Sequence, residues 1–331
     1  MMTWCEGPPE QVYRRLQNAV EQTLQGVVQS LHHRTVLLQT VPYVLQLPGK
    51  RVRPLLCLLA SALEGAEPWD ALPAAAAVEI LHAFTLVHDD IMDRSLLRRG
   101  QPTVHTRWDE PVAILTGDVL VGLAYQLMER YAGHSNFEQL ISILTRALID
   151  VSEGQALDLE LPARPRPVLE DYWRMIDGKT AALLRVSLLI GALLANVSAR
   201  TQTVLQELAV PLGRAFQLQD DLLDLVGETN QTGKQVGQDL REGKYTYAVL
   251  RALELAPESV LLQRYRECRG ASEAELPALL QLFQQMGIFS EIHQHAEQHY
   301  ARVFALLDQL PETPARDLLR SLVEQLRQRR R

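Results

Sequence analysis

Cysteines, aromatic residues and long apolar runs are all scarce in this chain of 331 residues. The three cysteines, Cys5, Cys57 and Cys268, are odd in number and far apart. This spacing excludes a disulfide framework and a CxxC zinc site, and it fits a reducing cytoplasm. The longest apolar run, residues 181–197, contains Arg185 and is short for a membrane span. We therefore expect a buried core helix there and no stable membrane insertion, and the N-terminus lacks the basic and apolar regions of a signal peptide.

Aromatic residues make up only 6% of the chain, whereas hydrophobic residues make up 47% and are mostly Leu and Ala. Alternating strand patterns are nearly absent, so we expect an all-α fold of helices packed on helices. A net charge of −7 gives no basic bias toward nucleic acid. Residues 227–243 have the composition of a loop. The expected helices are 10–47, 53–64, 73–93, 110–131, 135–160, 168–177, 179–197 and 200–226, with four or five shorter ones in 244–331.

Two aspartate clusters share the pattern DDxxD. The first and last aspartates of such a pattern lie one helical turn apart on the same face, so they can bind hard cations together. Mg²⁺ takes one or two carboxylates and shares the phosphate oxygens of a substrate. A solvated acidic helix face is the alternative, but both clusters lie in strongly apolar helices, where carboxylates need cations. The candidate metal ligands are Asp89, Asp90, Asp93, Asp220, Asp221 and Asp224.

The break LPARPRP at residues 161–167 could be a domain boundary. However, each half of the chain carries one aspartate cluster, and neither cluster alone makes a diphosphate site. We therefore expect one domain over residues 1–331, with the two clusters facing each other across a deep central cavity.

Basic and polar residues accompany both clusters. The segment PGKRVRP places Lys50, Arg51 and Arg53 at a helix start, which attracts anions. Arginines after the first cluster can bind phosphate as forks, although ordinary charged turns are the alternative for both segments. His82 and Thr85 continue the carboxylate stripe toward the start of the helix. The remaining candidates are Arg98, Arg99, Lys179, Thr180, Gln217, Lys234 and Lys244.

From residue 48 to residue 250 the chain resembles the trans-isoprenyl diphosphate synthases, also called polyprenyl synthetases. The resemblance rests on GKRVRP, HDDIMD, LLRRGQPTVH, LTGDVLVGLA, EGQALDLE, GKTAALL, FQLQDDLLD and GKQVGQDLREGK, in this order. It implies an isoprenoid-synthase fold, an all-α bundle of antiparallel helices around a deep central cavity, and a homodimer. It also implies head-to-tail condensation of isopentenyl diphosphate with dimethylallyl, geranyl or farnesyl diphosphate, with three Mg²⁺ ions per site.

The resemblance also implies roles for single residues. Asp89, Asp93 and Asp220 are the main metal ligands, and the other three aspartates lie nearby or act through water. Thr180 and Gln217 steady the allylic cation. The allylic diphosphate is held by Arg98, Lys179, Lys234 and Lys244, and isopentenyl diphosphate by Lys50, Arg53, His82 and Arg99.

The product length is expected to depend on Phe84 and Thr85, five and four residues before Asp89. In similar enzymes an aromatic residue followed by a small one at these positions accompanies geranylgeranyl diphosphate, the twenty-carbon product. Farnesyl or longer polyprenyl diphosphates are the alternatives, and an ordinary core role for Phe84 remains open.

The chain departs from the family pattern at residues 246–248, where Thr-Tyr-Ala replaces Thr-Leu-Pro, and it lacks the insertion in the first cluster of many bacterial farnesyl diphosphate synthases. A class I terpene cyclase would carry a different second metal motif. A non-catalytic subunit of a heteromeric synthase would usually lose one cluster. Both clusters are present here, which favours the synthase.

Overall fold

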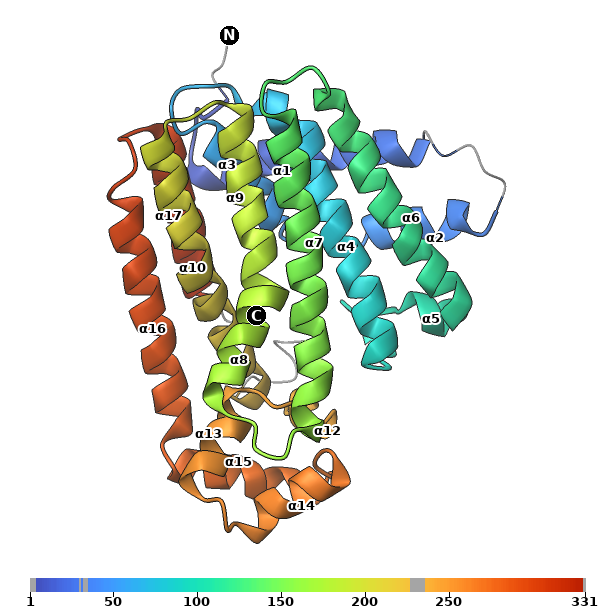
Figure 1. Cartoon of the computed structure of the whole chain (residues 1–331), viewed down its shortest axis with the longest axis vertical. Coiled ribbons are helices and arrows are strands. Elements are labelled where there is room, and N and C mark those ends of the chain that lie inside the picture. Colours follow the sequence, from blue (N-terminus) through green and yellow to red (C-terminus); the bar gives the residue numbers. More distant parts are fainter. Residues whose placement is uncertain (1–3, 30, 32–34, 227–235, 330–331) are drawn as a thin grey trace. The chain divides into compact units, whose positions relative to one another are not determined.

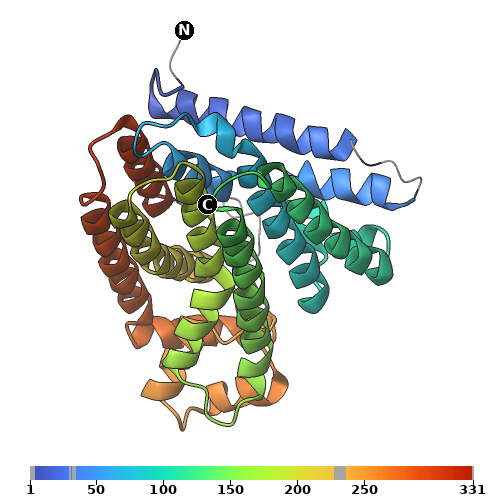
Figure 2. The same ribbon diagram turned by 45° about the horizontal axis from the view of Figure 1, so that its top comes forward.

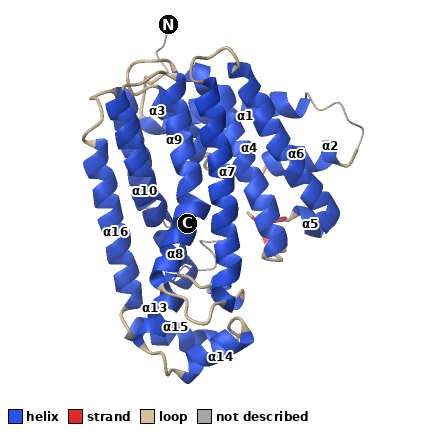
Figure 3. Cartoon of the chain, viewed as in Figure 1, coloured by secondary structure: helices blue, strands red, loops and turns tan. Residues whose placement is uncertain are grey.

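The computed structural model describes residues 4–29, 31, 35–226 and 236–329. Within these residues nearly every element is a helix, and the strands are confined to one short hairpin (Figure 3). The prediction of an all-α fold is therefore confirmed. The chain divides into two compact units, one of Met1–Leu148, Leu183–Glu207 and Leu306–Leu322 and the other of Ile149–Ala182, Leu208–Ala305 and Val323–Arg331. That they make a single domain stays a prediction.

The first unit is built around the helix of the first aspartate cluster, α4. Four consecutive alanines, residues 74–77, are fully buried, and their small side chains allow neighbouring helices to approach closely. This helix packs against α1, α3 and α6, and it runs beside α6 in both ribbon views (Figures 1 and 2). The elements wholly in this unit are α1 (Pro9–Gln29), α2 (Leu37–Leu45), α3 (Val52–Ser61), η1 (Pro68–Ala71), α4 (Leu72–Met92), β1 (Leu97–Arg98), β2 (Gln101–Pro102), α5 (Val104–Arg107), α6 (Glu110–Met128) and η2 (Glu129–Tyr131).

The second unit has its own apolar core, in which Tyr172, Tyr247 and Phe283 are among the largest buried side chains. Its complete elements are η3 (Leu161–Ala163), α8 (Leu169–Ile176), the π-helical turn η4 (Asp177–Ala181), α12 (Gln238–Arg241), α13 (Tyr247–Leu255), α14 (Val260–Cys268) and α15 (Leu276–Gln285). The helices with residues in both units are α7 (Phe137–Glu160), α9 (Ala182–Leu194), α10 (Ala199–Val226), α16 (Ile288–Leu307) and α17 (Pro314–Arg327).

Most of the expected helices are found within a few residues of their predicted bounds, but two expectations are wrong in part. The helix expected over residues 10–47 is two helices, since α1 ends at Gln29 and α2 begins at Leu37, and residues 30 and 32–34 between them lie outside the described part of the chain. The segment 227–243 is not all loop, since α12 lies in it, and residues 227–235 lie outside the described part of the chain.

Two stretches, Pro68–Met92 and Glu110–Tyr131, are long and apolar enough to cross a membrane by length and composition alone. In the fold 56% and 44% of their most apolar windows are buried. Core helices of globular proteins have the same composition, so this observation is weak evidence for a membrane span.

Candidate active site

The segment PGKRVRP enters α3 through a strained residue. Arg51 has a φ of 48°, a left-handed conformation that costs about 1–2 kcal/mol for a residue with a Cβ. Its guanidinium donates to Glu79 at 2.7 Å, to Glu21 at 2.6 Å and to the carbonyl of Leu45 at 2.7 Å. These buried contacts offset the strain and fix the start of the helix, so Arg51 is engaged in holding the segment together.

Arg53 and His82 form a different kind of pair. Nη1 of Arg53 lies 3.2 Å from Nε2 of His82. A guanidinium has donors only, so Nε2 accepts and the ring proton is on Nδ1. Burial, followed by the nearby arginines, holds the pKa of His82 well below its usual value, and burial lowers the pKa of Arg53 to about 10.

Two buried donors in this pair lack an acceptor among the described residues, namely Nε of Arg53 and Nδ1 of His82. Unsatisfied buried donors are rare in folded proteins, and each costs about 1–3 kcal/mol. An anion with several acceptor oxygens would satisfy both. The pair therefore has donors that suit a phosphate, and its predicted role in binding a diphosphate stays a prediction.

The hairpin of β1 and β2 brings the next two arginines to the same unit. Nε of Arg98 lies 2.7 Å from Asp90, and its Nη2 lies 3.8 Å from Asp89. Nη1 of Arg99 donates to the carbonyl of Pro48 at 2.6 Å. This approach depends on Gly49, because a Cβ there would lie 2.5 Å from the Arg99 guanidinium.

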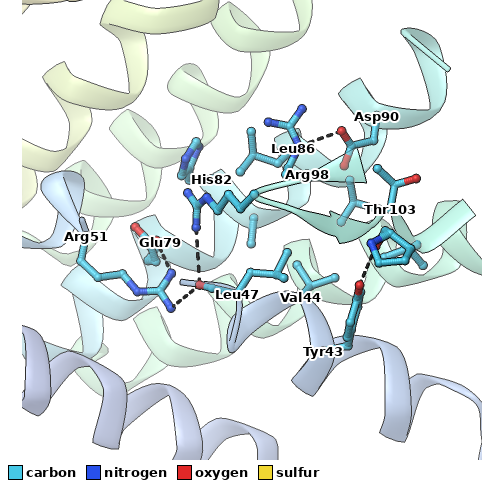
Figure 4. Close-up of a pocket in the computed structure, with 15 residues that line it drawn as sticks. Tyr43, Val44, Leu47, Arg51, Glu79, His82, Leu86, Asp90, Arg98 and Thr103 are labelled. Atoms are coloured by element: carbon cyan, nitrogen blue, oxygen red, sulfur yellow. Dashed lines mark hydrogen bonds and ion pairs between the residues drawn. The ribbon is translucent and has the colours of Figure 1, made fainter. Parts of the chain in front are cut away.

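A cavity opens between α2, α4 and the hairpin (Figure 4). Its cavity volume is about 30 Å³, enough for a few atoms. Apolar side chains of α2 and of the turn after it, among them Val44 and Leu47, form one wall. The charged and polar lining residues are Tyr43, Arg51, Glu79, His82, Asp90, Arg98, Arg99 and Thr103.

The first cluster ends α4, and its three carboxylates are not equivalent. Asp89 and Asp93 are half-buried, whereas Asp90 is buried and is held by Arg98. Burial raises the pKa of Asp90 to about 6, although the Arg98 charge acts in the opposite direction. The outer carboxylates are therefore accessible to a cation, whereas the middle carboxylate is engaged in its ion pair with Arg98.

The second cluster, on α10, repeats this division. Asp221 is buried and accepts hydrogen bonds from Tyr172 at 2.8 Å and from Gln217 at 2.9 Å, and burial raises its pKa to about 7. Asp220 is half-buried and forms an ion pair with Arg329 near the C-terminus. Asp224 accepts the backbone N–H groups of two residues at the start of α12.

These donor sets suit Mg²⁺ that is shared with a substrate. Among the described residues, no group of three or more acidic, His or Cys side chains could hold a metal ion by itself. A cation at either cluster would need further oxygens, from water or from phosphate. Mg²⁺ characteristically binds in this way.

Lys179 and Thr180 lie in the π-helical turn η4, where a break between two helices was expected. Nζ of Lys179 lies 2.7 Å from Asp158. The turn packs glycine against glycine on α7, because a Cβ on Gly154 would lie 2.3 Å from the Lys179 nitrogen and one on Gly178 would lie 2.7 Å from the carbonyl oxygen of Asp150. π-Helical turns are frequent at functional sites.

The structure describes two of the three other predicted lysines. Nζ of Lys244 lies 3.1 Å from Glu242, and Lys50 is exposed, with its carbonyl accepting from Gln17. Lys234 lies outside the described residues. The roles of these lysines stay predictions.

The model of the polyprenyl synthetase family matches residues 34–283 of the chain. The chain belongs to the polyprenyl synthetase family. A short chain isoprenyl diphosphate synthase of Methanothermobacter thermautotrophicus is 36% identical over 289 residues, which cover 87% of this chain and 89% of the relative. A geranylgeranyl diphosphate synthase of Sulfolobus acidocaldarius is 39% identical over 268 residues, 79% of this chain and 81% of the relative.

Solved structures agree with this family membership. A crystal structure of the geranylgeranyl pyrophosphate synthetase from Pyrococcus horikoshii matches with a TM-score of 0.89 at 30% identity, and it covers 97% of this chain and 99% of that one. Another geranylgeranyl pyrophosphate synthase matches with a TM-score of 0.88 at 34% identity, over 96% and 98%. The predicted isoprenoid-synthase fold and prenyltransferase class of this polyprenyl synthetase are therefore confirmed.

Sequence reasoning assigned no role to His88. Its ring contacts Phe84 edge-on, with centroids 4.7 Å apart, and its Nε2 lies 3.3 Å from the carbonyl oxygen of Ile114 on α6. A Cβ on Gly117 would lie 2.1 Å from Nε2, so the ring occupies the space that this glycine leaves. A glycine inside the helical pattern of LTGDVLVGLA was the available signal for such a close approach.

Proposed function

We propose that this polyprenyl synthetase condenses isopentenyl diphosphate head-to-tail with allylic diphosphates, in a reaction that needs three Mg²⁺ ions and ends at geranylgeranyl diphosphate. The observation that carries the proposal is the Arg53–His82 pair, whose two buried donors lack an acceptor among the described residues. Relatives named geranylgeranyl diphosphate synthase support this product. Others named geranylfarnesyl diphosphate synthase, at 35% and 32% identity, keep a longer product as the alternative.

In the proposed reaction the allylic C–O bond breaks and leaves an allylic cation and diphosphate. The double bond of isopentenyl diphosphate attacks this cation, and the proton lost from the adduct passes to the released diphosphate. When bound, Mg²⁺ supplies Lewis-acid neutralisation of the leaving group. The accessible carboxylates that hold it are those of Asp89, Asp93 and Asp220.

Two different sets of basic residues bind the diphosphates of the two substrates. Lys50, Arg53, His82 and Arg99 hold isopentenyl diphosphate, and Arg98, Lys179, Lys234 and Lys244 hold the allylic diphosphate. Thr180 and Gln217 face the cation. The apolar surroundings of the clusters keep water from quenching that cation.

Substitution of Arg53 by Ala is expected to raise the KM for isopentenyl diphosphate by about 10- to 100-fold, because a charge-assisted hydrogen bond contributes about 1.5–3 kcal/mol. Steady-state kinetics with each substrate varied in turn measures this change. The KM for the allylic diphosphate should stay within about twofold, because in this proposal Arg53 does not contact that substrate. Arg130→Ala, which removes an exposed arginine of the same unit, is the control. A rise confined to the allylic KM would reverse the assignment of the two diphosphate sites.

The function is tested by incubating the protein with labelled isopentenyl diphosphate and dimethylallyl, geranyl or farnesyl diphosphate, and then sizing the products. Geranylgeranyl diphosphate from every starter supports the proposal. Cyclised hydrocarbons would identify a terpene cyclase. Incorporation only after another chain is added would identify a non-catalytic subunit.

We also propose that the enzyme is a cytoplasmic homodimer. The three cysteines are odd in number and widely spaced, which fits a reducing compartment. On α6 the apolar side chains of Ile114 and Leu115 are 42% and 52% exposed, which suits contact with a second copy. Sedimentation equilibrium measures the mass directly, and a monomer at working concentration would contradict this part.

A further inference from the structure

Four polar side chains of the second unit form one continuous chain of hydrogen bonds. Thr180 donates to Oε1 of Gln217 at 3.1 Å, and Nε2 of Gln217 donates to Oδ1 of Asp221 at 2.9 Å. The hydroxyl of Tyr172 donates to Oδ2 of Asp221 at 2.8 Å. The chain joins α8, the turn η4 and α10, and Tyr172, Asp221 and Thr180 are all less than 10% exposed.

The direction of each bond follows from the carboxylate at the end of the chain. Three donors point at Asp221, namely the side chains of Tyr172 and Gln217 and the backbone N–H of Tyr247. Both carboxylate oxygens accept, so the amide nitrogen of Gln217 faces Asp221 and its oxygen faces Thr180. The hydroxyl of Thr180 has one proton and gives it to Gln217. The lone pairs of the Thr180 oxygen then remain available to a bound substrate.

We propose that Tyr172 and Asp221 are positioning residues, which orient Gln217 so that Thr180 presents its oxygen lone pairs, and not its proton, to the allylic cation. This inference rests on the proposed function, in which Thr180 faces the cation. A dipole fixed before the reaction stabilises developing charge without reorganising at that moment. Asp221 thus acts on the reaction through Gln217 and Thr180, and not as a metal ligand.

Asp221→Asn tests the inference with almost no change in shape. We expect the oxygen of the asparagine to keep the hydrogen bond from Tyr172, so that its amide nitrogen faces Gln217, which turns over to accept from it. Its nitrogen then faces Thr180, whose proton turns toward the cation. We expect kcat to fall by about 100-fold, the effect of losing one preorganised dipole, while KM for both substrates and the Mg²⁺ concentration for half-maximal rate stay near wild type.

The double variant Gln217→Glu with Asp221→Asn should restore the rate. The introduced glutamate accepts from the introduced amide and from Thr180, so the bond between positions 217 and 221 is remade with donor and acceptor exchanged, and the bond from Thr180 keeps its wild-type direction. The net charge equals that of the wild type. Recovery of most of the lost kcat is expected, because Thr180 again donates its proton inward.

Tyr172→Phe should lower kcat less than Asp221→Asn, because Gln217 keeps its bond to Asp221. The matched control is Tyr13→Phe, which removes another buried phenol, one that donates to the carbonyl of Leu318 in the other unit. It should lose similar thermal stability but keep its kcat. Circular dichroism and melting temperature show whether each variant is folded.

Two results would overturn the inference in a wild-type enzyme that makes prenyl diphosphates. One is an unchanged kcat in Asp221→Asn. The other is a double variant without recovery whose Mg²⁺ requirement is raised, because Asp221 would then be a metal ligand. If the wild type itself forms no prenyl product, the proposed function fails instead.

Discussion

Asp89→Ala and Asp220→Ala are each expected to lower kcat by about a thousandfold or more and to leave the helical fold intact. Metal ions that neutralise a leaving group contribute several kcal/mol to the transition state, and each ~1.4 kcal/mol is a factor of ten in rate. Both residues are outer members of their clusters and are half-buried, so their loss creates no large cavity. Single-turnover kinetics at saturating Mg²⁺ measures the chemical step.

Circular dichroism on the same preparations separates catalysis from folding. Asp317→Ala, in the exposed first turn of α17, is the control and should keep its kcat. Removing Mg²⁺ from the wild type with a chelator should abolish turnover, and adding the ion back should restore it. Turnover close to wild type in either Asp89→Ala or Asp220→Ala would refute the requirement for both clusters.

Phe84→Ala is expected to lengthen the product beyond twenty carbons, and Thr85→Phe is expected to shorten it to farnesyl diphosphate. Phe84 lies five residues before Asp89, about 7.5 Å along the helix at 1.5 Å per residue. Its ring packs on His88, which occupies the space above Gly117, so the aromatic ring is held at a fixed depth. Removing the ring opens that space to a growing chain, whereas a ring at position 85 blocks it earlier.

Product sizing by chromatography after incubation with excess isopentenyl diphosphate measures both changes. Phe137→Ala, at the half-buried start of α7, removes the same side chain elsewhere and should not change product length. If both substitutions at 84 and 85 leave product length unchanged, Phe84 is an ordinary core residue and another side chain sets the length.

The sequence predicted those features that depend on neighbours along one helix. The spacing of Asp89 and Asp93 defines a helical face. The bounds of α4 lie within one residue of the predicted ones, and Pro73 marks the first turn of the helix. Arg53 and His82 were predicted as an anion site, which stays a prediction, and the structure adds the two unpartnered donors on which its test depends.

The sequence could not predict the features that depend on distant partners. Buried Asp221 accepts a hydrogen bond from Tyr172, which lies 49 residues away in the chain. Similarly, the ring of His88 is placed by a glycine on another helix, and no periodicity of α4 contains that information. The prediction of one helix over residues 10–47 was wrong because α1 and α2 are both apolar on one face and the stretch between them is short. A short interruption is hard to distinguish from the ordinary irregularity of a helical pattern.

The glycine contact beneath Lys179 has a consequence for directed evolution. An alanine in a helix interior is ordinarily more stable than glycine by about 0.5–1 kcal/mol, so random libraries would be expected to enrich it. At Gly154 that gain is small against a methyl 2.3 Å from a backbone nitrogen. Libraries selected for new prenyl products should therefore show almost no diversity at 154 and 178, and should collect their useful changes on α4.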